Sequence, residues 1–268
     1  MPYFKYMKIE SIKPITVRKW QNKLLKIGYS ETYLKTINNQ FNAIMNYAVK
    51  YYNLSKNPGH TAGTIGKKNA EEKDFWTLDE FNAFINVIEN KEHKIIFNLL
   101  YFTGMRIGEL LALTPNDFYN NYIDINKNYV VTNGIGKINP PKTPKGNRII
   151  YVSELIINDT LEYINTLYSL KNNDRIFMFS RSYPAKLMDK YCKLSGEKKI
   201  RIHDQRHSHV SLLIELGVNI TTISDRLGHE KIDTTWNTYA HLYPNQRQDV
   251  VNKIDDVISQ SRQNNAIE

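Results

Sequence analysis

The sequence predicts a mainly α-helical protein with a small antiparallel β-sheet, an α+β fold, and three observations support this class. Apolar residues recur at helical spacing through most of the 268-residue chain. Capping and stop residues flank those segments, as helix ends require. Only residues 120–152 differ, since "YIDIN" alternates, "YVV" and "RIIYV" are rich in β-formers, and "NGIGKINPPKTPKGN" between them is turn material.

Two helices are expected in the first quarter of the chain. The first has one apolar face and stops at Gly28, and the second follows Ser30, a favoured N-cap residue. Their apolar faces consist of Val17, Trp20, Leu24 and Ile27, and of Ile37, Phe41, Ile44, Met45 and Ala48. The following segment has turn residues and charges but almost no apolar side chains. We therefore predict a helical domain at residues 1–60 and a linker at 61–74.

Residues 75–268 are expected to form a second domain. It opens with the capping-box pattern of Thr77 and Glu80. A second helix ends at Gly104, and a third, "MRIGELLALT", ends before Pro115. After the sheet, helices are expected at about 155–170, 185–194, 204–216 and 221–227. A last helix is expected from Asn245 onward, with an apolar stripe of Val250, Val251, Ile254, Val257 and Ile258.

Charge and composition restrict the class of protein. The net charge is +9, and residues 1–66, with ten Lys or Arg and two acids, carry +8 of it. This concentration indicates a module that binds a polyanion, although a solvated basic surface has the same pattern.

No apolar run reaches the ~18 residues of a membrane span, and the N-terminus does not resemble a signal peptide. The single cysteine, Cys192, excludes an internal disulfide. We expect a cytoplasmic protein without a membrane partner.

The segment "RIHDQRHSHVSLLIELG", residues 201–217, fits either a metal or an anion. His203 and His207 have the spacing of zinc ligands on a helix, but Asp204 stands where a metalloprotease has its glutamate. A third ligand would have to be His229 or His241. The anion interpretation fits better, because Arg206 lies in the first turn of an expected helix, where unpaired N–H groups also favour a phosphate.

Other segments supply further groups of this kind. Arg106 follows Gly104 at an expected helix start, and Lys142 lies in a loop between strands. His229 follows a Gly228 helix stop, and Tyr239 lies ten residues later. Taken singly, each residue has an ordinary explanation, such as a surface arginine paired with Glu109 or an exposed hairpin lysine. Their order and spacing together are informative.

The ordered set resembles the tyrosine recombinase (phage integrase) family. "TGMRIGELLAL", "HDQRHSHVSLL" and "LGHEKIDTTWNTYAHL" are similar to the signature boxes of that family, and the basic segment is similar to its helical core-binding domain. The resemblance covers about residues 1–243. Many integrases of this kind have an arm-binding domain ahead of the core-binding region. This sequence begins with the segment that resembles the core-binding region. The implied catalytic set is Arg106, Lys142, His203, Arg206, His229 and Tyr239.

The resemblance implies a role for each of these residues. Tyr239 attacks the scissile phosphorus, and Arg106, Arg206 and His229 bind its oxygens. Lys142, with Lys145 as the alternative, protonates the leaving 5′-oxygen. His203 assists proton transfer from Tyr239. No metal, cofactor or ATP is required. His207, His209 and His241 have no assigned role, and Glu109 either braces Arg106 or is solvated.

The resemblance also implies partners and a reaction. It implies a site-specific recombinase that integrates or excises a mobile element and closes as a C-shaped clamp on double-stranded DNA at attachment sites. The enzyme is expected to be a monomer in solution and a homotetramer on DNA, with an excisionase and a host DNA-bending protein as further partners. The alternatives are a type IB topoisomerase-like enzyme, a catalytically silent DNA-binding relative and a zinc hydrolase.

Overall fold

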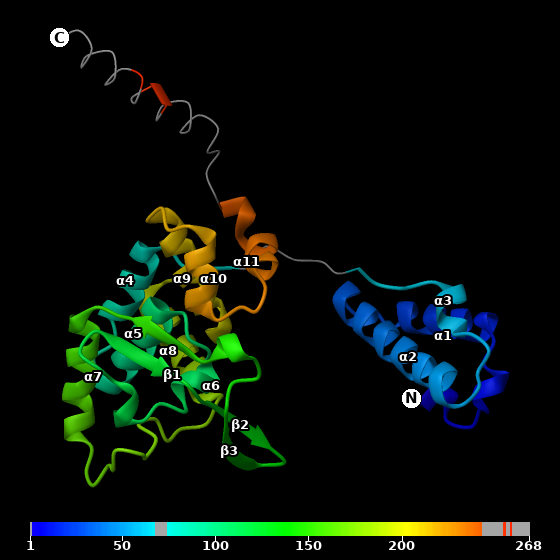
Figure 1. The fold of residues 1–268 in the computed structure, drawn as a ribbon, viewed down its shortest axis with the longest axis horizontal. Coiled ribbons are helices and arrows are strands. Elements are labelled where there is room, and N and C mark those ends of the chain that lie inside the picture. The colour runs from blue at the N-terminus through cyan, green and yellow to red at the C-terminus, as the bar shows by residue number, and fades with distance from the viewer. Residues whose placement is uncertain (1, 68–73, 243–253, 256–257, 259–268) are drawn as a thin grey trace. The chain divides into compact units, whose positions relative to one another are not determined.

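The chain folds into two compact units, one formed by the first 72 residues and one by residues 73–268. The computed structural model describes residues 2–67, 74–242, 254–255 and 258. Figure 1 shows the helices and strands of both units. The described residues are mostly helical, with short antiparallel strand pairs, which confirms the predicted fold class.

The described residues of the first unit include the α-helices α1 (Pro14–Lys26), α2 (Glu31–Tyr51) and α3 (Pro58–Ala62). The Ser30 hydroxyl accepts a hydrogen bond from the Tyr33 amide, so the expected N-cap is confirmed. Aromatic rings of Trp20 and Phe41 lie 5.0 Å apart between the helices. The buried apolar residues of this unit's core are Ile12, Val17, Trp20, Phe41, Met45 and Ala62.

Two details of the first unit differ from the prediction. Ile27 and Ile44, expected on the buried faces, are exposed. Conversely, Ala62 and Ile65, at the start of the expected linker, are buried. Polar groups hold this segment in place, since the buried Gln21 amide donates to the Gly63 carbonyl at 2.8 Å. An apolar pattern does not reveal packing of this kind, so residues up to Ile65 extend the packed unit beyond residue 60.

The larger core of the second unit includes residues of α4 (Leu78–Asn86), α5 (Lys91–Thr103), α7 (Glu154–Thr166) and α8 (Tyr183–Ser195). Thr77 and Glu80 form the expected capping box of α4. Helix α5 is buried along most of its length and contacts α7 and α9. The aromatic core includes Trp76, Phe81, Phe84, Phe97 and Tyr101.

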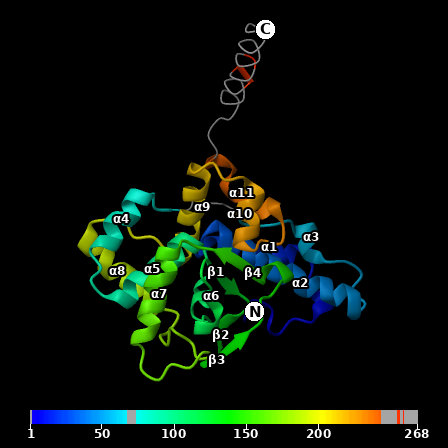
Figure 2. The same cartoon turned by 60° about the vertical axis from the view of Figure 1, so that its left-hand side comes forward.

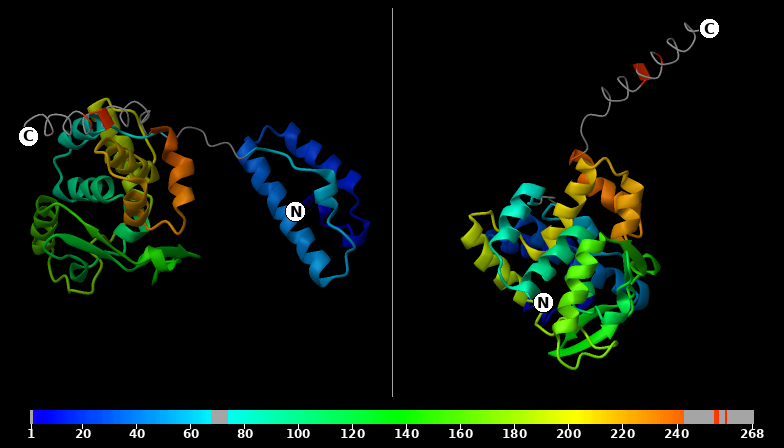
Figure 3. Two further views of the ribbon diagram at one scale, coloured as in Figure 1. Left: turned by 45° about the horizontal axis from the view of Figure 1, so that its top comes forward. Right: turned by 90° about the vertical axis from the view of Figure 1, so that its left-hand side faces the viewer.

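The strands form two pairs instead of one sheet. β1 (Tyr122–Ile125) pairs with β4 (Arg148–Tyr151), and β2 (Asn128–Thr132) pairs with β3 (Ile135–Asn139). Asn133 and Gly134, both with positive φ, make the two-residue turn of a twisted hairpin. This β2–β3 hairpin is largely exposed and projects from the unit (Figures 1 and 3).

The remaining helices form a second, smaller core. Figure 2 shows α9 (Gln205–Glu215), α10 (Ile220–Leu227) and α11 (Ile232–Tyr239) gathered on one side of the strands. Their shared buried residues are Val210, Ile214, Ile223, Leu227 and Tyr239. The expected helix before Pro115 is short, since α6 spans only Ile107–Leu110.

The expected C-terminal helix lies mostly outside the described residues. Of that segment the structure describes only residues 254, 255 and 258, which are helical. No helix in the described part of the chain is both long and apolar enough to cross a membrane.

Candidate active site

Arg206 occupies the centre of the site and is held by the ends of two helices. Its side chain is buried, with Nη1 donating to the Gly104 carbonyl at 2.7 Å and Nη2 donating to the Leu227 carbonyl. These carbonyls lie at the C-termini of α5 and α10, where helices carry partial negative charge. Burial, together with the charge of Arg106, lowers the pKa of Arg206. Its position is therefore fixed by the backbone, and it forms no ion pair with a carboxylate among the described residues.

The glycines at these two helix ends permit the close approach. Gly104 has φ +64°, and a Cβ there would lie 2.6 Å from the ring of His209. Gly228 has φ +67°, and its Cβ would lie 2.6 Å from the Lys145 carbonyl. Both residues thus combine a left-handed conformation with a contact that leaves no room for a side chain.

Arg106 is positioned by Glu109, which is itself buried. Glu109 accepts hydrogen bonds from the Arg106 side chain and backbone, both at 2.8 Å, and two more from Arg148. Burial raises the pKa of the Glu109 carboxyl, but the hydrogen bonds and charge of Arg148 and the charge of Arg106 outweigh it, and the pKa falls to about 2. Glu109 is therefore a brace for Arg106 and not a solvated helix residue.

Arg148 connects three parts of this arrangement. Besides Glu109, its guanidinium donates to the Arg226 carbonyl at 2.7 Å and to the Gly146 carbonyl at 3.2 Å. The first carbonyl belongs to the end of α10, and the second to the loop between β3 and β4. One buried side chain thus joins α6, α10 and the Lys142 loop.

Tyr239 ends α11 and is buried, and its hydroxyl hydrogen-bonds to Nδ1 of His207. Burial raises the pKa of the phenol, and the nearby Asp204 raises it further against the opposing charge of Arg206. The exposed ring of His203 stands edge-on to that of His207, with centroids 5.5 Å apart. The group that contacts the Tyr239 hydroxyl is thus His207, to which the sequence analysis assigned no role.

His229 is half-buried and lies beside the two arginines. Its Nδ1 is 2.7 Å from the buried hydroxyl of Thr235. Burial, and then the charges of Arg206, Arg106 and Arg148, lower the pKa of His229 to about 4. The imidazole is therefore neutral at neutral pH.

These electrostatic couplings show which predicted residues the fold brings together. The charges of Arg106, Arg206 and His203 all act on His229, and Arg206 interacts electrostatically with Tyr239. Five of the six predicted residues therefore lie close enough to interact electrostatically, although Arg106 and Tyr239 are 133 positions apart in the chain. Such a cluster of cations stabilises an anion that binds among them.

Lys142, the sixth predicted residue, is exposed in the loop between β3 and β4. It lines a pocket of about 450 Å³ together with Arg106 and Glu109. The alternative residue, Lys145, instead forms an ion pair with Asp225 of α10 at 3.2 Å. The arrangement thus favours Lys142 over Lys145 as the lysine that reaches a ligand beside Arg106.

Comparison with known proteins identifies the family. Residues 74–246 match the model of the phage integrase family, and residues 1–25 match that of the phage integrase N-terminal SAM-like domain. The first match covers well over half of the chain. The chain belongs to the phage integrase family.

Relatives within the integrase family are similar along most of the chain. The ICEBs1 integrase of Bacillus subtilis is 29% identical over 96% of this chain and 74% of its own length. A XerC-like tyrosine recombinase of Caldanaerobacter subterraneus is 27% identical over 94% of this chain and 73% of its own. The chain is accordingly a site-specific DNA recombinase of the tyrosine type, and the topoisomerase-like and silent alternatives are not favoured.

Solved structures share the fold. The Tn1549 transposon integrase, in complex with transposon right end DNA, has a TM-score of 0.73 at 23% identity and covers 94% of this chain and 87% of its own. The XerH site-specific recombinase, bound to a palindromic difH substrate, has a TM-score of 0.70 at 20% identity, covering 95% and 76%. At these identities the likeness concerns the fold alone.

The zinc interpretation of the histidine segment gains no support from the geometry. Among the described side chains, no group of three or more His, Cys, Asp or Glu residues is placed to hold a metal ion. His207 directs Nδ1 at Tyr239, and His209 accepts a hydrogen bond from Arg226 at 3.1 Å. Burial, with the charges of Arg226 and Arg206, lowers the pKa of His209 to about 3. The side chain of His241 lies outside the described residues.

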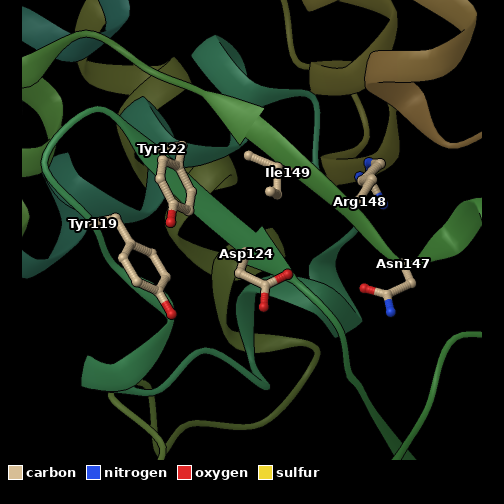
Figure 4. A pocket seen from close by; sticks show the side chains of 6 residues that line it. All are labelled: Tyr119, Tyr122, Asp124, Asn147, Arg148 and Ile149. Carbon is tan, nitrogen blue, oxygen red and sulfur yellow. The ribbon is translucent and has the colours of Figure 1, made fainter.

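A separate pocket of about 470 Å³ lies on the β1–β4 pair of this integrase (Figure 4). The rings of Tyr119 and Tyr122 stack at its edge with centroids 4.4 Å apart, and Asp124 lies between them and the start of β4. None of the six predicted catalytic residues lines it. Of the described residues, Arg148 is the one cationic residue that lines it, whereas the pocket at Arg106 is lined by Arg106, Lys127, Lys142 and Arg181.

Three residues of the integrase site were missed by sequence reasoning. His207 lies in the same segment as His203 and Arg206, so its position next to Arg206 was an available signal. Arg148 had no signal, because its role depends on β4 lying beside α6 and α10. Arg181 lines the pocket at Arg106, although it lies 75 residues further along the chain.

Proposed function

We propose that Tyr239 is the nucleophile of this recombinase. Its hydroxyl oxygen attacks the scissile phosphorus, the bond to the 5′-oxygen breaks, and a 3′-phosphotyrosine and a 5′-hydroxyl form. The covalent link conserves the bond energy, so the reaction needs no ATP. A 5′-hydroxyl from a partner strand then attacks the phosphotyrosine and releases Tyr239. The observation that carries this proposal is a set of contacts. Arg206 binds the Gly104 and Leu227 carbonyls, which lie two residues before Arg106 and two before His229, and the adjacent His207 contacts the Tyr239 hydroxyl.

Arg106 and Arg206 bind the non-bridging oxygens of the phosphate in this proposal. Their charges stabilise the negative charge that develops in the transition state, as metal ions do in many nucleases. His229 is neutral, with a pKa of about 4. When the Thr235 hydroxyl donates to its Nδ1, the proton is on Nε2, and His229 donates a hydrogen bond to the phosphate from that atom.

Two proton transfers accompany the proposed cleavage. Lys142 protonates the departing 5′-oxygen from its place beside Arg106. At the other end, a phenol with a raised pKa must lose its proton on attack. His207 accepts that proton directly, because its Nδ1 contacts the hydroxyl. His203, whose ring adjoins that of His207, assists this transfer.

The proposed substrate is double-stranded DNA at the attachment sites of a mobile element, which the enzyme integrates or excises. Support comes from the net charge of +8 on residues 1–66 and from the DNA bound by the similar Tn1549 integrase and XerH. The two units close around the duplex as a clamp. Four copies exchange strands as a tetramer on DNA and separate to monomers without it. An excisionase and a host DNA-bending protein set the direction of the reaction.

Covalent trapping tests the proposed function. The purified protein is incubated with DNA from the element and its host, and fragments that remain attached in denaturant are sequenced. A synthetic nicked duplex with the recovered sequence is then offered to Tyr239→Phe. This variant should form no adduct and should bind DNA as the wild type does. Tyr168→Phe, at a tyrosine that is 98% exposed, is the control and should form the adduct normally. An adduct with Tyr239→Phe would show that the nucleophile is another residue.

A further inference from the structure

Arg181 links two pockets of the catalytic unit. One is the pocket of Arg106 and Lys142, and the other, of about 420 Å³, is lined by Ile107, His203 and the segment Lys199–Ile202. Arg181 lines both. The start of α6 also separates them, since Arg106 and Gly108 face one pocket and Ile107 faces the other. The two pockets therefore adjoin, with Arg181 at their junction.

Most cations in these two pockets already have a carboxylate partner. Arg106 is paired with Glu109, Lys127 with Asp117, Lys199 with Asp189 and Arg201 with Asp204. Among the described residues, Lys142 and Arg181 are the lysine and arginine of this lining that have no hydrogen bond or ion pair to an acid. Lys142 has a role in the proposed chemistry. The charge of Arg181 is not compensated within the described part of the chain.

Such an arginine is suited to bind an anion from outside. It is exposed in the loop between α7 and α8, two residues before α8 begins, so a ligand can reach it. Its guanidinium fork matches two oxygens of one phosphate. The positive charge of Arg181 is repelled by those of the neighbouring cations, and a bound phosphate offsets this repulsion.

The spacing of phosphates along DNA indicates that the anion bound by Arg181 is a second phosphate of the DNA substrate. Along one DNA strand a phosphate recurs every ~3.4 Å of helix axis, so a strand that places one phosphate at Arg106 has others nearby. We propose that Arg181 binds a phosphate of the cleaved strand that flanks the scissile phosphate. This contact fixes which phosphate of the DNA strand lies between Lys142 and His203. This inference rests on the proposed function, because that function places the scissile phosphate at Arg106.

Salt dependence of binding provides the first test. Variants are made in the full chain carrying Tyr239→Phe, so that no chemistry interferes with binding. The probe is a fluorescent duplex of arbitrary sequence, titrated at several salt concentrations. Arg181→Ala should lower the slope of log affinity against log salt by about one, as expected for one lost phosphate contact. Arg181→Lys should retain the slope. Lys171→Ala, which removes an exposed cation from the same loop but from neither pocket, should leave the slope unchanged.

Neutral phosphates provide the second test and locate the contact. Single methylphosphonates replace each phosphate around the scissile one in the duplex recovered by covalent trapping. A methylphosphonate at one position flanking the scissile phosphate should weaken DNA binding by about tenfold when residue 181 is arginine. The same methylphosphonate should not weaken DNA binding by the Arg181→Ala variant. An unchanged salt slope for Arg181→Ala, or equal sensitivity of both proteins at every position, would overturn the proposal. Failure of the proposed function is seen separately, as absence of an adduct when Tyr239 is intact.

Discussion

At the residue scale, the site is built from charged side chains whose positions are fixed by buried partners. Arg206 is held by two backbone carbonyls, and Arg106 by Glu109. Such contacts orient a guanidinium before any ligand arrives, which reduces the reorganisation needed in the transition state. Four residues with strongly shifted pKa values, Glu109, Arg206, His229 and Tyr239, lie here.

Glu109 should make stability depend on pH in the acid range. Its folded pKa of about 2 is below the ordinary value of 4.5. A depressed carboxyl pKa stabilises the folded state above about pH 4.5, and this contribution, on the order of 3 kcal/mol, is lost as the pH falls towards 2. The difference in unfolding free energy between wild type and Glu109→Gln should therefore shrink between pH 5 and 2. Urea titrations at several pH values measure this difference in unfolding free energy. A difference that does not change with pH would contradict the lowered pKa of Glu109.

His207 should control removal of the Tyr239 proton. Replacing His207 with glutamine keeps a polar group of similar size but removes a base that can take up the proton. We expect cleavage of the nicked duplex to slow by roughly 10²-fold, the usual contribution of a general base. The rate of His207→Gln should rise with pH, because hydroxide then replaces the missing base.

His203→Gln is the matched comparison for that variant, since the two rings adjoin. It should slow cleavage less than His207→Gln does. Thermal melting of both variants shows whether the buried position 207 has also lost stability. If both variants are folded and His203→Gln slows cleavage more than His207→Gln does, then His203 is the residue that accepts the Tyr239 proton.

At the element scale, helix ends and one loop bring the site together. α5 and α10 both end at glycines in the left-handed conformation, and Arg206 binds the carbonyls there. The loop between β3 and β4 carries Lys142, and it is joined to α6 and α10 through Arg148. Pairing of β2 with β3 fixes where this loop begins, and pairing of β1 with β4 fixes where it ends.

Lys142→Ala should slow cleavage of ordinary DNA by about 10²-fold or more, because the 5′-oxygen leaves poorly without a proton. A 5′-phosphorothiolate at the scissile bond should restore the rate, since sulfur leaves without protonation. Lys145→Ala is the control on the same loop, and it should lose only an exposed ion pair with Asp225. Equal slowing of Lys142→Ala on both substrates would remove Lys142 from the acid role, and rescue of Lys145→Ala would assign the role there.

At the scale of the whole molecule, charge and chemistry reside in different units. Residues 1–66 carry +8 of the net +9, whereas the six predicted catalytic residues all lie beyond residue 73. The first unit has its own apolar core, and the second has a larger one. Non-specific affinity for DNA and strand cleavage should therefore be separable.

A fragment of residues 67–268 should bind duplex DNA more weakly than the full chain. Its salt slope should also be shallower, by about 0.9 for each phosphate contact that the first unit makes. Fluorescence titrations of both proteins on one duplex measure the two slopes. The isolated fragment should still melt cooperatively, since its core is complete. If the slopes are equal, the basic face of the first unit is only a solvated surface.

From the amino-acid sequence alone we could predict the fold class, most helix positions and the six residues of the proposed catalytic set. This was possible because helical periodicity, caps and glycine stops are local signals, and because the signature boxes are contiguous in the chain. Tertiary structure decided what each side chain contacts. It paired Tyr239 with His207, buried Glu109 between two arginines, separated the strands into two pairs and placed Arg181 between two pockets. Contacts of the site join residues as far apart in the chain as Gly104 and Arg206, and no local pattern encodes such pairings.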